Sequence, residues 1–310
     1  EWHYFNILAP DESYWLYLTF LVGGRITTGE WGGQLIANLI RPASGERRFM
    51  GRFDAEEVGF RLDRPDLDMG TSTVRVRSDG NYHLAARVPA VDGGGDTLSV
   101  DLILSPGDLR YLPPVDVSPG GFASGYVVPV LDGHSTGELC VSSRCETLEA
   151  APSYHDHNWG VWRRVTWDWG SMRAGDLSIL YGGVRRGPGQ ADGRDNDDLV
   201  GERFLFVVDS LGLRAVLPVR DIEYRWNGDV DPNDTARGPS GFVLRAARNT
   251  DSLVLRVQVD HLRSTSREED RAFFHQMRGS GDVQGSLLGG DVRSDGSGFF
   301  ETWTRTAKVP

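Results

Sequence analysis

The chain has little of several features that mark large classes of protein. Of its 310 residues only two are cysteines, and the 33 basic residues are outnumbered by 44 acidic ones, for a net charge of −11. Phosphate binding needs a basic surface, so we expect no nucleic-acid partner. The same charge disfavours electrostatic docking on anionic lipid. The longest apolar run, Tyr14–Val22, is far shorter than the ~18 residues of a membrane-spanning helix and suits a buried strand.

The sequence also lacks the common cofactor and nucleophile motifs. It has no Walker loop, no Gly-x-Ser-x-Gly elbow and no dinucleotide-binding fingerprint.

The two cysteines, Cys140 and Cys145, flank a predicted hairpin turn. They form either a disulfide in an oxidising compartment or two reduced thiols. A zinc site is disfavoured, because it would need about four ligands. The sequence does not decide the compartment: a cytoplasmic or membrane-associated location is favoured, and a periplasmic or secreted one is expected if the disulfide forms.

What the chain does have is strand patterning and turn chemistry. Glycine (39 residues) and proline (15) are frequent, and apolar and polar residues alternate in Thr71–Arg77, Tyr82–Val88 and Thr97–Leu104. Turn sequences such as Ser78–Asn81 separate these segments. The pattern predicts an all-β, mostly antiparallel protein with at most a short helix, over Ser266–Met277, where Ser-Arg-Glu-Glu resembles a helix cap.

The heptad Tyr154–Gly160 is the most informative segment. It reads Tyr-His-Asp-His-Asn-Trp-Gly and places acids, imidazoles and large aromatics side by side. Side chains alternate between faces in a strand, so Tyr154, Asp156 and Asn158 should share one side. The imidazoles and the indole should share the other.

The two halves of the chain look like distant copies. Glu1–Asn6, followed by a strand that ends at Arg25, is similar in order to His155–Gly160, followed by a strand that ends at Arg185. This similarity predicts two β-barrel-like domains, residues 1–150 and 151–310, with the heptad at the start of the second.

Several segments resemble a known superfamily. Glu1-Trp2-His3-Tyr4-Phe5 resembles the Glu-Trp-Trp-Tyr-Phe opening of the lipocalin-like superfamily that contains carotenoid 1,2-hydratase (hydroxyneurosporene synthase) and AttH-type proteins. The heptad is similar to its central signature, Trp167–Gly170 to the aromatic strand that follows, and Gly298–Trp303 to its C-terminal strand. The chain departs from the pattern at His3, where the family usually has Trp, and at Asp168, where carotenoid hydratases tend to carry His.

The resemblance implies two consecutive lipocalin-like β-barrel domains. It also implies water addition to an isolated isoprenoid double bond, without metal or organic cofactor. Such a reaction needs an acid that protonates carbon and aromatic faces that stabilise the cation. We predict Asp156 as proton donor, polarised by His155 or His157, with Asp168 as second acid or as the base that activates water. The predicted substrate-binding residues are Tyr154, Asn158, Trp159, Trp167, Trp169 and Tyr181.

Structural alternatives stand beside these roles. Asp156 and Asn158 could bridge the two domains through backbone hydrogen bonds. His155 and His157 could be a buried, satisfied pair or two ligands of a strand-borne metal, although no third ligand is evident nearby. Asp168, between two tryptophans, could simply face outward.

The predicted function is a cofactor-independent acid–base hydratase or cyclase of an apolar, carotenoid- or terpenoid-like alkene. Its partner is a hydrophobic small molecule, with peripheral membrane contact as one route of substrate uptake. The alternatives are a non-catalytic carrier of a lipophilic ligand and a pericyclase that folds a polyene, because a barrel that binds such molecules need not convert them.

Overall fold

The structure, a computed structural model, describes residues 1–25, 28–61, 64–111, 116–117, 123–160, 165–186, 203–226, 238–267 and 272–305. It consists of antiparallel strands in two compact units, Glu1–Val161 and Trp162–Pro310. The predicted all-β class with two barrel-like sheets is confirmed. None of the described segments forms a helix that is long and apolar enough to cross a membrane.

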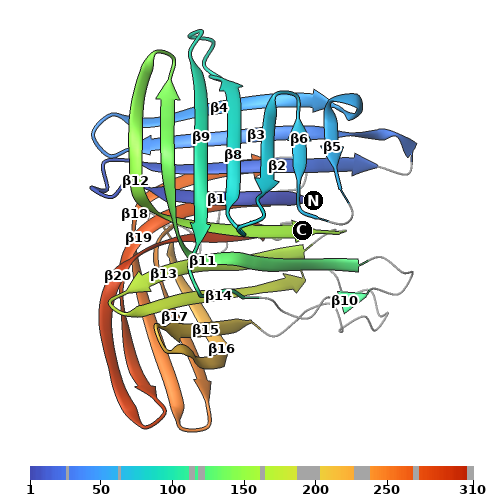
Figure 1. Cartoon of the computed structure of the whole chain (residues 1–310). Coiled ribbons are helices and arrows are strands. Elements are labelled where there is room, and N and C mark those ends of the chain that lie inside the picture. Colours follow the sequence, from blue (N-terminus) through green and yellow to red (C-terminus); the bar gives the residue numbers. More distant parts are fainter. Residues whose placement is uncertain are drawn as a thin grey trace. The chain divides into compact units, whose positions relative to one another are not determined.

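The first unit is built on one sheet of twelve strands (Figure 1). Strand β10 (Asp116–Val117) pairs only with β11, and a 3-10 turn, η2 (Ala55–Glu57), joins β4 to β5. The other strands follow one another in the order β4 (Gly45–Asp54), β3 (Glu30–Arg41), β2 (Trp15–Arg25), β1 (Trp2–Leu8), β12 (Arg144–Trp159), β11 (Ala123–Val141), β9 (Thr97–Pro106), β8 (Tyr82–Pro89), β7 (Ser72–Val76), β6 (Leu67–Met69) and β5 (Val58–Phe60).

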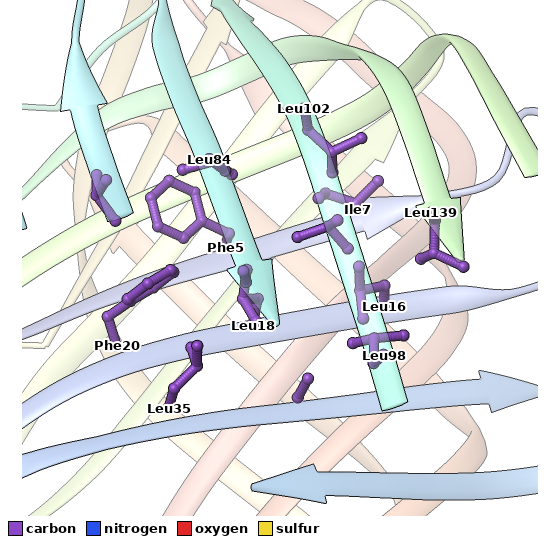
Figure 2. Close-up of a cluster of buried hydrophobic side chains, with 14 of the residues drawn as sticks. Phe5, Ile7, Leu16, Leu18, Phe20, Leu35, Leu84, Leu98, Leu102 and Leu139 are labelled. Atoms are coloured by element: carbon purple, nitrogen blue, oxygen red, sulfur yellow. The ribbon is translucent and has the colours of Figure 1, made fainter. Parts of the chain in front are cut away.

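Alternation along these strands creates the core of the first unit. Figure 2 shows Phe5 and Ile7 from β1 pointing toward Leu18 from β2, Leu84 from β8 and Leu102 from β9. All five side chains are fully buried. Burial of this apolar face, at roughly 25 cal/mol per Å², supplies most of the stabilisation of the sheet.

The second unit is a closed barrel of eight strands in chain order. Closure gives each of these eight strands a partner on both sides. Its interior is lined by aromatic rings: Tyr181 stacks on Phe300 at 6.2 Å between ring centroids and meets the edge of Phe242 at 5.8 Å. The strands are β13 (Val165–Ala174), β14 (Leu177–Arg186), β15 (Phe204–Asp209), β16 (Gly212–Trp226), β17 (Pro239–Arg248), β18 (Asp251–Arg267), β19 (Ala272–Leu287) and β20 (Gly290–Arg305).

The helix predicted over Ser266–Met277 is wrong where the structure describes it. Ser266 and Arg267 end β18, and β19 begins at Ala272, while residues 268–271 lie outside the described residues. Cross-strand pairing of β19 with β20, such as Phe274 with Trp303, outweighs the local capping signal.

The predicted start of a second domain at residue 151 falls inside one continuous strand, β12. The register shift that leaves residues 149 and 150 without partners on β11, with Ala150 at φ 51°, is a β-bulge. The heptad therefore belongs to the first unit. The two segments that looked like copies, Glu1–Asn6 and His155–Gly160, are neighbours in one sheet, because β1 pairs with β12 antiparallel.

Cys140 and Cys145 are cross-strand partners in the β11–β12 hairpin, and their sulfur atoms are bonded. Of the alternatives left open by the sequence, the structure contains the disulfide.

Candidate functional site

The heptad lies on the last part of β12, in extended conformation, and its side chains alternate as predicted. Asn158 Nδ2 donates a hydrogen bond of 2.6 Å to Asp156 Oδ1 on one face. On the other face the ring of His157 lies 5.3 Å from that of Trp159. This second face is the core side, because His155 stacks on Phe5 with ring centroids 4.1 Å apart.

Asp156 is a buried carboxyl group, 5 % exposed. Burial raises its pKa from 3.8 to about 7, and the hydrogen bonds from Tyr154 and Asn158 offset only part of that rise. Near neutral pH the protein therefore holds a substantial population with this carboxyl protonated. A group in that state can both donate and accept a proton.

The face of Asp156 continues across β1 and β2 as a layer of polar aromatic side chains. Tyr4 is the cross-strand partner of Asp156, and its ring meets Tyr154 edge-on at 6.5 Å. Its hydroxyl accepts a hydrogen bond from Asn6 Nδ2 (3.1 Å), and Asn6 Oδ1 accepts one from the Trp15 indole (2.5 Å). Sequence reasoning missed Tyr4, Asn6 and Trp15, although the alternation of polar residues at positions 4 and 6 hinted at a shared face.

The histidines occupy the opposite face of β12 and do not polarise Asp156. The groups that hydrogen-bond its carboxyl are Tyr154 and Asn158. His155 is fully buried, and its Nδ1–H donates to the carbonyl oxygen of Tyr4 at 3.0 Å. Burial, with smaller contributions from the neighbouring histidines, lowers the pKa of His155 well below its usual value, so this ring is neutral at pH 7.

His157 completes a histidine cluster that the sequence did not reveal. Its Nε2 lies 3.0 Å from Glu1 Oε1, and its ring stacks on that of His3 at 3.9 Å. Glu1, His3 and His157 are close enough to hold one metal ion, whereas the sequence had suggested no third ligand for the histidines of β12. A second group, Glu138 with the two cysteines, offers no free thiolates because the cysteines are bonded to each other.

Asp168 lies in the second unit and points into the barrel, so the alternative of an outward residue is wrong. It is fully buried. Its Oδ1 accepts hydrogen bonds from the Tyr224 hydroxyl (2.8 Å) and the Thr302 hydroxyl (3.0 Å), and Arg203 Nη1 lies 3.7 Å from Oδ2. Burial and then the charge of Asp168 raise the pKa values of Tyr181 and Tyr224 well above their usual range, so both phenols remain protonated donors.

The aromatic residues of the second unit that the sequence predicted as substrate contacts do not all lie on the same side of the barrel wall. Tyr181 is part of the barrel core, but Trp167 and Trp169 lie on the other face of β13 from Asp168. Trp167 stacks on Trp303 at 5.2 Å, and Trp169 meets Phe204 edge-on at 6.1 Å. The two tryptophans therefore do not line the barrel interior that holds Asp168.

Searches against protein-family descriptions and against curated proteins found no match for the chain. Solved structures do share its fold. An AttH-type protein from Nitrosomonas europaea has a TM-score of 0.62 at 16 % identity, over 97 % of this chain and 91 % of that one. Kievitone hydratase from Nectria haematococca gives 0.63 at 12 % identity, over 98 % and 88 % of the two chains. CghA gives 0.62 at 14 % identity, over 98 % and 87 %. Over nearly its whole length the chain has the two-unit β fold of these proteins.

Proposed function

We propose that this protein is a cofactor-independent acid–base hydratase or cyclase, and that Asp156 delivers the proton. The observation that carries the proposal is the state of that carboxyl: buried, held by Asn158 and Tyr154, and with a pKa raised to about 7. Protonating carbon needs a carboxylic acid that is still protonated at neutral pH, and desolvation is the way proteins keep one.

The reaction can be written with every proton accounted for. The alkene takes the carboxyl proton of Asp156 and becomes a carbocation, leaving a carboxylate. In a hydratase, water adds to the cation and returns one proton to the carboxylate, giving an alcohol. In a cyclase, a second double bond of the same molecule captures the cation, and the carboxylate removes a proton to form the new alkene. Both end with Asp156 protonated, so no cofactor is consumed.

Aromatic groups beside Asp156 suit the cationic step. The rings of Tyr4 and Tyr154 flank the carboxyl, and a π face stabilises a cation by about 0.5–2 kcal/mol. Trp159 lies on the opposite face of β12 from Asp156, and the second unit contains Asp168, Trp167, Trp169 and Tyr181. We therefore assign the proton transfer to Asp156 without these residues.

Two further points support the proposal. One of the proteins with this fold is named as a hydratase. The sequence resemblance to carotenoid 1,2-hydratase makes an isoprenoid alkene the substrate class to try first.

The test is incubation of the protein with acyclic carotenoids and shorter polyprenyl compounds in deuterated water. A hydratase or protonation-initiated cyclase must place deuterium on carbon, because the transferred proton exchanges with solvent. Product without carbon-bound deuterium would contradict the proposal and identify a pericyclase. Tight binding of the panel without any product would identify a carrier.

A further inference from the structure

On the core side of β12, the described residues include a buried imidazole whose ring nitrogens make no hydrogen bond. His3 is fully buried, and neither Nδ1 nor Nε2 makes a hydrogen bond with any residue that the structure describes. An unsatisfied buried polar group costs roughly 1–3 kcal/mol, so such groups usually have a ligand or a function.

Two potential metal ligands lie beside His3. Glu1 Oε1 is 3.6 Å from His3 Nε2 and 3.0 Å from His157 Nε2. In a tetrahedral zinc site with bonds of ~2.0–2.1 Å, ligand atoms stand ~3.3 Å apart. The observed distances of 3.0 and 3.6 Å fall on either side of that value. A hydrogen bond between Glu1 and His157 would explain the shorter distance, but it leaves His3 unexplained.

The residue types also suit metal binding. Glu1, His3 and His157 can each offer one ligand atom, and these atoms all lie within 4.8 Å of one another. Two imidazoles and one carboxylate form a ligand set found in zinc enzymes.

We propose that Glu1, His3 and His157 bind one divalent ion of the zinc class, joining β1 to β12 on the core side of the sheet. His3 and His157 are cross-strand partners, so the ion would link neighbouring strands. Their rings are nearly parallel, at 14°, so the ring lone pairs lie in parallel planes and do not converge on one point between the rings. Binding therefore requires one ring to turn. His157, the more exposed of the two at 16 %, is the one with room to do so.

The site is separate from the proposed proton donor. Asp156 lies on the other face of β12 and is bonded by Asn158 and Tyr154. The ion would leave that carboxyl's hydrogen bonds in place. Its measurable consequence is stability, because an ion that binds only the folded chain raises the melting temperature.

The experiment uses the full chain without an affinity tag, stripped with a chelator and titrated with Zn²⁺ in a calorimeter. We expect one Zn²⁺ per chain with a dissociation constant of about 1 µM or tighter, and a melting temperature that rises with added zinc. Co²⁺ should bind in its place and give the visible absorption of a low-symmetry, four- or five-coordinate site, which reports the site in the unmodified protein.

Two variants and a matched control identify the ligands. His157→Gln and His3→Gln should each weaken Zn²⁺ binding by at least about tenfold, since removing even an outer-shell partner costs 10–100-fold. His157 is partly exposed, so that variant should stay folded by circular dichroism. His83→Gln is the control: His83 lies on β8 of the same unit and pairs with Asp101 instead. Absence of stoichiometric binding by the unmodified chain, or wild-type affinity in folded His157→Gln, would overturn the proposal.

Discussion

The two faces of β12 hold ionisable groups that respond to pH in opposite directions. On one face, burial favours the protonated, neutral form of Asp156 and raises its pKa to about 7. On the other, burial favours the deprotonated, neutral form of His3, paired across from His157, and lowers its pKa to about 4. The same physical cause, removal of water, favours the neutral species on both sides of one strand. Near neutral pH, one face therefore holds a carboxyl group, Asp156, that is partly protonated. The other face holds an imidazole, His3, that is unprotonated.

The largest expected effect is on catalysis by Asp156→Asn. An amide cannot release a proton, and general acid catalysis contributes about 10²–10⁴-fold, so turnover should fall by about that factor. In the unmodified protein, kcat/KM should decline as pH rises through about 7, because the acid form of Asp156 is lost. The measurement is steady-state kinetics from pH 5 to 9.

Asp101→Asn provides the matched control, because that carboxylate lies on β9 of the same unit and is 76 % exposed. It should keep wild-type turnover. If Asp156→Asn retained full activity, the donor would have to be another group.

The second effect is on the pH dependence of stability. The folded-state pKa of Asp156 is raised above its unfolded value of 3.8, so its contribution is fully present below pH 3.8 and is lost as pH rises through 7. At 1.36 kcal/mol per unit, the loss amounts to about 4 kcal/mol. Relative to wild type, Asp156→Asn should therefore gain about that much free energy of unfolding between pH 4 and pH 8. Urea denaturation of chelator-treated protein at both pH values measures it, and a constant difference would contradict the raised pKa.

The third effect is the contribution of His3, on the core side, to the pH dependence of stability. It has the opposite sign to that of Asp156. The pKa of His3 is depressed below its unfolded value of 6.5, so its contribution is present above pH 6.5 and is lost as pH falls toward 4. The predicted loss is about 3 kcal/mol. His3→Gln should remove it, so the metal-free variant should lose less stability than wild type on acidification. In the wild-type protein, the contributions of Asp156 and His3 to the pH dependence of the unfolding free energy partly cancel. Comparison of Asp156→Asn with His3→Gln separates them.

The sequence predicted the division of β12 into two faces, but not what each face meets. A period of two is a local property, so Tyr154, Asp156 and Asn158 could be placed on one side from the chain alone. Pairing with β1 joins segments from opposite halves of the chain, and nothing in the heptad indicates that Tyr4 or His3 lies beside it. For the same reason, the sequence predicted a domain boundary at residue 151, next to what is a β-bulge within β12.

Asp168 illustrates a second limit of sequence reasoning. Alternation correctly separated it from Trp167 and Trp169, but hydrophobicity suggested that the tryptophans face inward. The interior of the closed barrel beside Asp168 already contains the Tyr181 and Phe300 rings, and Gly170 touches both, since a Cβ there would lie 2.7 Å from each. The tryptophans lie outside, and hydroxyl groups from two other strands donate hydrogen bonds to one oxygen, Oδ1, of the Asp168 carboxylate inside.

The smallest expected effect comes from removing the disulfide. It tests whether the pH responses of Asp156 and His3 depend only on the residues around the heptad. The disulfide Cys140–Cys145 lies at the far end of β12, with a sequence separation of 5. Closing so short a loop contributes about 2 kcal/mol, so replacing both cysteines with serine should lower the free energy of unfolding by about that amount. Because the hairpin end of β12 touches neither Asp156 nor His3, both pH slopes should keep their signs and sizes in urea denaturation. A changed slope would mean that the two faces are coupled through the length of the strand, and that the burial of Asp156 depends on the hairpin as well as on its immediate neighbours.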